Sequence, residues 1–281
     1  MRFLDPKTDF AFKKLFGGED SKLRLINLLN SVLALPRQQQ ISQVEIIDPY
    51  LAPKIKGIKD TYVDVKATDQ QGTQFIIEMQ VLSVAYFEKR VLYNACKAYS
   101  SQLKKAEDYA TLNKTIAITF TDFVMFKEVE NIKSTVLLKN QHNQLYSEDL
   151  SLVFLELPKF TNSEKELTTD LDRWLYFLRH ADDLSMIPKE YASNPLFKGA
   201  FDCLNESNMT NEELDIQEKK LFFLADQKRI LTEKKQLESK LEQAIINMLD
   251  KNISVADIAQ IMQISVETVK QIVNRDSDIK S

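Results

Sequence analysis

Residues 60–81, DTYVDVKATDQQGTQFIIEMQV, decide the fold, because apolar and polar residues alternate on both sides of a short polar loop. Alternation with period two is typical of β-strands. The connection at 70–72 is Gln-Gln-Gly, a three-residue loop with glycine at a position that commonly requires φ > 0. If Asp69 faces Thr73 across this loop, every other pair follows. The stretch therefore predicts a β-hairpin of fixed register.

The predicted register gives the hairpin one apolar and one polar face. The apolar face consists of Val63, Val65, Ala67, Phe75, Ile77, Met79 and Val81. The polar face carries Asp64, Lys66, Glu78 and Gln80, and it sets Asp64 opposite Glu78. Two directly opposed carboxylates destabilise a strand pair unless a cation lies between them, which indicates a divalent metal site. The alternative is an ordinary solvated face on which Lys66 neutralises Glu78.

The composition predicts one main domain with a smaller appendage. The chain has 281 residues, of which 44% are hydrophobic and 28% are charged, and this is enough to bury a substantial core. Its formal net charge is -4, so the molecule offers no broad basic field. A contact with nucleic acid must then come from a local patch.

The sequence also indicates the cell compartment and the type of metal ligand to expect. The stretch MRFLDPKTDF has no apolar signal core, and no run approaches the roughly eighteen apolar residues of a spanning helix, which predicts a cytoplasmic protein with no membrane partner. Cys96 and Cys203 are the only cysteines, which suits a reducing compartment and excludes a cysteine-based zinc site. His142 and His180 have no second histidine or cysteine at ligand spacing. Any metal is therefore expected to have oxygen ligands.

The other periodic segments place the hairpin in a larger order. Residues 6–17 and 21–33 are predicted helices, and 42–51 is a predicted strand. Residues 83–106 predict one long helix. A strand at 116–120 follows, parallel to a hairpin strand if the helix is its crossover. The coarse order is therefore helix, three strands, helix, strand.

Basic and aromatic residues gather on both sides of the hairpin. In the predicted helix at 83–106, one stripe holds residues three or four apart, namely Tyr86, Arg90, Tyr93 and Lys97. Arg90 is the candidate clamp for a phosphate or carboxylate, with Tyr93 beside it, and the alternative is a surface salt-bridge face. The loop at 53–59 bears lysines that either meet phosphates or only increase solubility, and they are Lys54, Lys56 and Lys59.

Three blocks of sequence carry a resemblance to a known family. They are DPKTDFAFKKLFG at 5–17, YVDVKATDQQGTQFIIEMQ at 62–80 and FEKRVLYNACKAYSSQL at 87–103. The chain resembles the PD-(D/E)xK nuclease superfamily and, within it, the Rpn-like recombination-promoting nuclease and transposase group, over about residues 1–160. The resemblance implies a mixed α/β (α+β) fold with a restriction-endonuclease-like core of helix, three strands, helix and strand. It also implies a metal-dependent DNA endonuclease linked to recombination or transposition.

The same resemblance assigns roles within the hairpin. Asp64 and Glu78 correspond to the acidic ligands of Mg²⁺ or Mn²⁺, to which the backbone carbonyl of Met79 adds a further oxygen. Gln80 completes the catalytic set where the superfamily motif has lysine. A lysine ammonium helps orient or deprotonate the attacking water, whereas a neutral amide only forms hydrogen bonds. The candidates for supplying the missing charge are Lys13, Lys66 and Arg90.

Two functional classes therefore remain open. The favoured class is a metal-dependent endonuclease whose partner is DNA. The rival is a catalytically weak or inactive nuclease-fold module, degenerate at Gln80, that binds DNA or a protein partner. In either class, the candidate contacts to DNA phosphates are Lys13, Lys66, Arg90, Tyr93 and Lys97.

The segments after the nuclease-like domain of residues 1–160 predict a helical C-terminal part. Residues 161–210 are a predicted helical extension, and 211–281 a charged helix with a helix-turn-helix-like pair that targets DNA or forms a homodimer. The candidate recognition face is Glu267, Lys270, Gln271, Asn274 and Arg275. The alternative is a hairpin that only packs. The shift in composition predicts that the part from 211 onward is separable from the chemistry.

Overall fold

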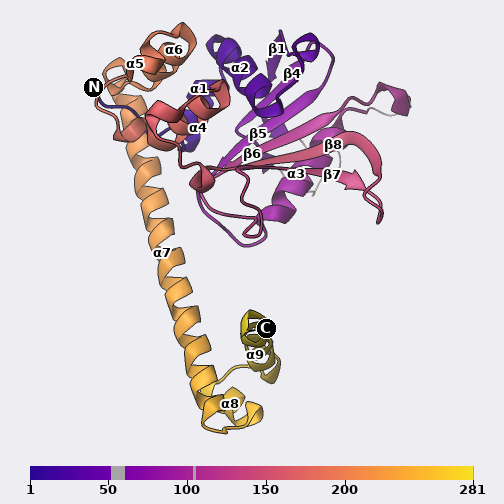
Figure 1. Cartoon of the computed structure of the whole chain (residues 1–281), viewed down its shortest axis with the longest axis vertical. Coiled ribbons are helices and arrows are strands. Elements are labelled where there is room, and N and C mark those ends of the chain that lie inside the picture. The colour runs from indigo at the N-terminus through magenta and orange to yellow at the C-terminus, as the bar shows by residue number, and fades with distance from the viewer. Residues whose placement is uncertain (52–60, 104–105, 281) are drawn as a thin grey trace. The chain divides into compact units, whose positions relative to one another are not determined.

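The computed structural model of the chain describes the backbone of residues 1–51, 61–103 and 106–280. Side chains beyond Val273 are not described, so those of Asn274 and Arg275 lie outside the described residues, as do Lys54, Lys56 and Lys59 of the predicted basic loop. The chain divides into two compact units, Met1–Leu221 and Phe222–Ser281 (Figure 1). This division falls inside the charged helix predicted from 211 onward.

A six-stranded mixed sheet forms the centre of the first unit. Its strands, in spatial order, are β1 (Val44–Ile47), β4 (Val65–Asp69), β5 (Gln74–Gln80), β6 (Thr115–Thr121), β8 (Leu145–Glu156) and β7 (Lys133–Lys139). The β5–β6 and β6–β8 pairs are parallel, and the other three pairs are antiparallel. A separate ladder pairs β2 (Tyr50–Leu51) with β3 (Thr61–Tyr62). Helix α3 (Phe87–Ser101) connects β5 to β6, so the predicted crossover is confirmed.

The register predicted from the hairpin loop is confirmed where the two strands pair. The N–H of Asp69 donates to the carbonyl of Thr73 at 3.1 Å, and Val65 lies opposite Ile77. Gly72 has φ 84°, and a Cβ on this residue would lie 2.8 Å from a neighbouring side-chain oxygen. The loop therefore requires glycine for both its backbone conformation and its close approach to a neighbour.

Two details of the predicted strands are wrong. Asp64 lies in a bend immediately before β4, so the alternation of side chains breaks there. As a result, Val63 packs with Ile76 on one face of the sheet, whereas Val65 packs on the other face. The strand predicted over 42–51 is divided into β1 and β2, which belong to different sheets.

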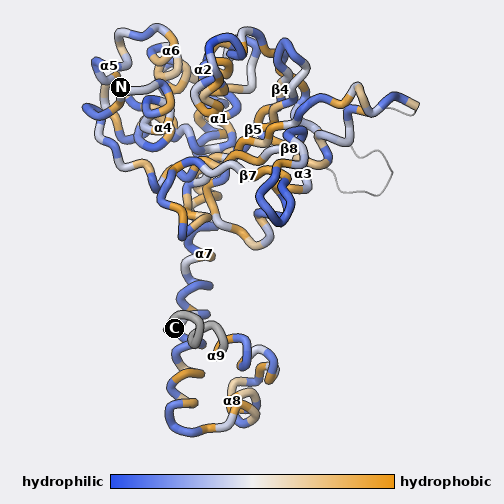
Figure 2. Tube along the Cα trace, turned by 45° about the vertical axis from the view of Figure 1, so that its right-hand side comes forward, coloured by the Kyte–Doolittle hydropathy of each residue, from blue (hydrophilic) through white to orange (hydrophobic). Residues whose placement is uncertain are grey.

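Helices cover both faces of the six-stranded sheet. Helix α3 packs on one face through Ala95 and Ala98, which contact Ile76. The other face contributes to a larger core shared with α1 (Asp9–Phe16), α2 (Lys22–Leu33), α4 (Asp170–His180), α5 (Lys189–Ala192) and α6 (Pro195–Leu204). Figure 2 shows hydrophobic residues concentrated in the central strands. The layers are those of the predicted mixed α/β class.

Residues of the predicted extension at 161–210 belong to the same core as the sheet. Trp174 is fully buried, and its ring lies 5.3 Å from that of Phe16 in an edge-to-face arrangement. The Nε1 of Trp174 donates a hydrogen bond to Asn27 at 2.7 Å. A buried aromatic residue of this size contributes a large apolar area. The extension therefore completes the helical layer of the first unit.

The helices next to the hairpin begin in different ways. Helix α1 starts with an N-cap, because Thr8 accepts a hydrogen bond from the N–H of Ala11 at 3.3 Å, and it ends at Gly17, as predicted. Helix α3 begins at Phe87, not near residue 83, after Tyr86 with φ 62° and ψ 23°. A left-handed conformation is uncommon for a bulky residue.

The second unit is a helical hairpin packed against the end of α7 (Asn211–Asp250). Helices α8 (Val255–Met262) and α9 (Val266–Lys280) share a small core with that end of α7. The predicted pair of helices is therefore present, and the side chains exposed on α9 include Glu267, Lys270 and Gln271. Whether they contact DNA stays a prediction. In the described part of the chain, no helix combines the length and apolarity needed to cross a membrane.

Candidate active site

Asp64 is held at the point where the first hairpin strand begins. Its Oδ2 accepts a hydrogen bond from the N–H of Met79 at 2.8 Å, which ties the bend before β4 to β5 beside Glu78. The side chain of Asp64 is only 17% exposed. A carboxylate with little solvent requires a cation, a proton or further donors to be stable.

Helix α1 brings a second carboxyl group to Asp64. The negative charge of Asp9 acts on Asp64 and raises its pKa, so the two carboxyl groups influence each other's ionisation. The Nζ of Lys13 lies 2.7 Å from Oδ1 of Asp9 and 3.8 Å from Oδ1 of Asp64. Asp9, Asp64 and Lys13 therefore form one cluster between α1 and the hairpin.

The pKa values of this pair move in opposite directions. Burial, together with the hydrogen bond and negative charge of Asp9, raises the pKa of Asp64 to about 7, against the lowering effects of the N–H of Met79 and the charge of Lys13. Burial opposes ionisation of Asp9 as well, but hydrogen bonds with Lys13 and Asp64 leave its pKa below the usual value. Of the two carboxyl groups, Asp64 is therefore the one that binds a proton more readily.

Glu78 lies next to α3, which contacts it through Asn94. It is buried, and its Oε1 accepts a hydrogen bond from Asn94 at 2.8 Å. Asn94 in turn accepts from the hydroxyl of Thr61 at 2.9 Å. Burial raises the pKa of Glu78, while the Asn94 hydrogen bond and the charge of Arg90 lower it. Glu78 is thus not part of a solvated face.

Gln80 follows Glu78 at the end of β5 and contacts α3. Its Oε1 accepts a hydrogen bond from Arg90, and its Nε2 donates to the carbonyl of Leu82 at 2.6 Å. Both ends of the amide are therefore fixed. The guanidinium of Arg90 also lies 5.6 Å from the ring centroid of Phe87, which restricts its position.

The three candidates for the missing charge occupy different places. Arg90 contacts Gln80, and Lys13 lies beside Asp64. Burial lowers the pKa of Lys66, and the negative charge of Asp48 partly opposes this shift. Of the three, Arg90 is the one bonded to the residue that stands where the superfamily motif has lysine.

The ladder between β4 and β5 ends at Val65 and Ile77, so the predicted opposition of Asp64 and Glu78 is not part of it, and each carboxyl has its own partners. Asp64 accepts a hydrogen bond from the N–H of Met79 and lies beside Lys13, whereas Glu78 accepts one from Asn94. Among the residues that the structure describes, no three His, Cys, Asp or Glu side chains gather closely enough to hold a metal ion. Oxygen donors from two carboxylates, a main-chain carbonyl and water remain an appropriate set for Mg²⁺.

Asp9 is the residue that reasoning from the sequence missed. It stands in the block at 5–17, and its spacing from Lys13 marks an i,i+4 ion pair on a helix. Nothing in that spacing shows which strand the helix will meet. The contact with Asp64 comes from tertiary packing of α1 on the sheet.

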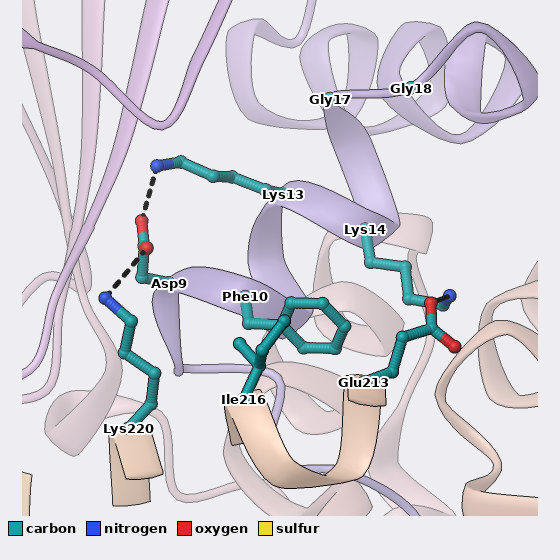
Figure 3. Close-up of a pocket in the computed structure, with 9 residues that line it drawn as sticks. All are labelled: Asp9, Phe10, Lys13, Lys14, Gly17, Gly18, Glu213, Ile216 and Lys220. Carbon is teal, nitrogen blue, oxygen red and sulfur yellow. Dashed lines mark hydrogen bonds and ion pairs between the residues drawn. The ribbon is translucent and has the colours of Figure 1, made fainter. Parts of the chain in front are cut away.

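The beginning of α7 also reaches this cluster. Lys220 lies 3.4 Å from Oδ2 of Asp9, and Figure 3 shows Asp9 between Lys220 and Lys13. Close by, Glu213 forms an ion pair with Lys14 beside a pocket of about 360 Å³. The first turns of α7 are thus part of the surroundings of the carboxyl pair.

Among the remaining candidates, Tyr93 and Lys97 lie on α3 near Arg90. The Nζ of Lys97 is 5.6 Å from the ring centroid of Tyr93. Arg90, Tyr93 and Asn94 line a groove with a volume of about 760 Å³. Contact of these side chains with DNA stays a prediction.

The six-stranded mixed sheet with helices on both faces agrees with a nuclease-like fold. A family model described as PD-(D/E)XK nuclease family transposase matches residues 6–234. The chain belongs to this family. The match continues past the predicted domain end at 160 and includes the first part of α7. No curated protein and no solved structure gave a match.

Proposed function

We propose that the chain is a metal-dependent DNA endonuclease that hydrolyses phosphodiester bonds and acts in recombination or transposition. The observation that carries the proposal is the little-exposed carboxyl of Asp64, with Asp9 beside it, fixed next to the strand that bears Glu78. Membership of a nuclease family supports a DNA substrate. The buried position of Glu78 and the fixed amide of Gln80 support a built site over a degenerate surface.

The residues present fit a hard divalent cation, Mg²⁺ or Mn²⁺. The raised pKa of Asp64 favours its protonated form, and a cation bound there would compete with that proton. Asp64, Glu78 and the carbonyl of Met79 would hold the ion, with Asp9 close to Asp64. When bound, such an ion polarises a phosphoryl oxygen and makes a coordinated water more acidic.

The basic side chains on the two sides of the hairpin have complementary roles in this proposal. Lys13 balances the charge of the Asp9–Asp64 pair. Arg90 holds the amide of Gln80 and presents its guanidinium to the phosphate that is cut. Asn94 fixes one oxygen of Glu78, so that the other remains able to act as a ligand.

The activity is tested with supercoiled plasmid DNA and the full chain. Nicked or linear DNA is expected with Mg²⁺ or Mn²⁺ and not with EDTA. Cleavage that persists undiminished in EDTA would contradict the metal-dependent mechanism. Intact DNA under all metal conditions, together with retained DNA binding, would favour the rival binding module.

Binding of the metal itself is expected to depend on pH around the pKa of Asp64. Because the carboxyl of Asp64 holds a proton below about pH 7, that proton competes with the cation. Calorimetric titration with Mn²⁺ is expected to show affinity rising by about tenfold per pH unit below that value and levelling off above it. A titration with the Asp64→Ala variant serves as the control, and equal binding by both proteins would contradict the site.

The contact between Gln80 and Arg90 leads to a prediction about charge placement. Gln80→Ala should lower the cleavage rate about 10- to 100-fold, since Arg90 loses its fixed partner. Gln80→Lys alone places two cations together and should also lose activity. The double variant, Gln80→Lys with Arg90→Gln, exchanges the cation and the amide between the two positions. We expect the double variant to be more active than either single variant, measured as a double-mutant cycle of cleavage rates. Additive losses would show that the two side chains act independently.

A further inference from the structure

A groove runs along the first half of α3, next to the residues assigned to phosphodiester chemistry. It is open to solvent and has a volume of about 760 Å³. Arg90 and Asn94 line it, and they are the side chains bonded to Gln80 and Glu78. A strand of DNA bound in this groove would therefore pass directly beside the proposed catalytic residues.

The wall of the groove combines aromatic rings with cations. Tyr86 is 74% exposed, and the ammonium of Lys89 lies 5.3 Å from its ring centroid. Tyr93 is 39% exposed and has Lys97 at 5.6 Å. Each tyrosine offers a flat apolar face, and each lysine places a positive charge at its edge or face. Aromatic rings with adjacent cations match a ligand made of flat bases and phosphates.

The backbone at Tyr86 adds an independent observation. Its φ of 62° lies in the left-handed region, which costs about 1–3 kcal/mol for such a residue. Because the side chain is mostly exposed, burial in the core does not account for this conformation. Retained backbone strain is characteristic of positions that contact a ligand.

The chemistry of the groove distinguishes between two forms of DNA. In a duplex, the bases stack on one another and the outer surface consists of phosphates, for which cations alone are sufficient. Unpaired bases have free faces, and stacking on an aromatic side chain contributes about 1–3 kcal/mol per base. The flat face of the exposed Tyr86 ring has a stacking partner only in the second case.

We propose that Tyr86 and Tyr93 form a stacking platform for unpaired bases, with Lys89 and Arg90 binding the adjacent phosphates. The substrate class is then DNA that carries a single-stranded segment next to the phosphate that is cut. The position of the cut rests on the proposed function, whereas the binding of unpaired bases does not. The platform is therefore measured in EDTA, where DNA stays intact.

The experiment compares binding of a fluorescent single-stranded oligonucleotide with binding of its duplex by anisotropy. The full chain should bind the single strand more tightly. Tyr86→Asn removes the ring but tolerates the left-handed backbone, and it should weaken single-strand binding about 5- to 100-fold with little effect on the duplex. Tyr86→Trp keeps a stacking face and should retain binding. Tyr146→Asn, which changes an exposed tyrosine of β8, is the matched control and should bind as wild type does.

The outcomes separate this proposal from the proposed function. Equal binding of single strand and duplex, or unchanged single-strand binding by Tyr86→Asn, would overturn the platform even if the protein cuts DNA. Selective binding that depends on Tyr86, in a protein that cuts no DNA with Mg²⁺ or Mn²⁺, would leave the platform standing and refute the endonuclease. A folding defect is checked by thermal unfolding, and the Tyr86→Trp variant keeps the comparison decisive.

Discussion

Asp64→Asn is expected to lower the rate of plasmid cleavage by about 10³-fold, equivalent to about 4 kcal/mol in the barrier. Asparagine has the size of aspartate and can still accept the hydrogen bond from the N–H of Met79. It cannot supply an anionic ligand. The rate is measured in single-turnover assays with Mg²⁺, and Asp20→Asn, an exposed position on the first unit, serves as the matched control.

The same substitution is expected to stabilise the metal-free protein at high pH, which separates lost chemistry from lost folding. The pKa of Asp64 is about 7 in the folded protein, above its ordinary value of 3.8. Its contribution to the free energy of unfolding is therefore fully present below pH 3.8 and is lost as the pH rises through 7. Above pH 7, the Asp64→Asn variant should unfold at a higher temperature than wild type. Its free energy of unfolding should be larger by about 1–4 kcal/mol. The difference should shrink towards zero near pH 4. A variant less stable than wild type at pH 8 would contradict the burial argument.

The sequence was sufficient for the hairpin because its signals are local. Period-two alternation and the Gly72 loop determine which residues pair, and the register over β4 and β5 follows from them. The bend at Asp64 was not visible, since no glycine or proline marks it and its cause is a tertiary hydrogen bond to Met79. The alternation alone therefore predicts the wrong face for Val63.

The candidate site was predictable only in its β-strand half. Glu78 and Gln80 follow from the motif, but the contacts made by Asp9 and Lys220 depend on how α1 and α7 pack on the sheet. Residues far apart in the chain leave no periodic signal of their contact. The boundary predicted at 211 could not be checked from the sequence for the same reason. A charged composition on one face of a helix does not show whether its other face packs against the first unit.

Removal of α7 is the second change with a large expected effect. A chain ending at 210 loses Gln217, which is buried and accepts a hydrogen bond from Thr8 at 2.8 Å. Thr8 is the N-cap of α1, the helix that carries Asp9. The fragment also loses the Lys220–Asp9 ion pair and the packing of Leu214 against the main core. We expect the free energy of unfolding to fall by about 3 kcal/mol or more, with exposed apolar surface promoting aggregation.

A chain ending at 234 is the matched comparison, because it keeps every contact of the first unit and the whole span of the family match. It should remain monodisperse in light scattering and unfold near the temperature of the full chain, with Mn²⁺ affinity unchanged. The fragment ending at 210 should lose both stability and metal binding, since α1 no longer holds Asp9 against Asp64. If the shorter fragment is as stable and as active as the longer one, α7 only follows the nuclease unit in the chain and contributes nothing to its site.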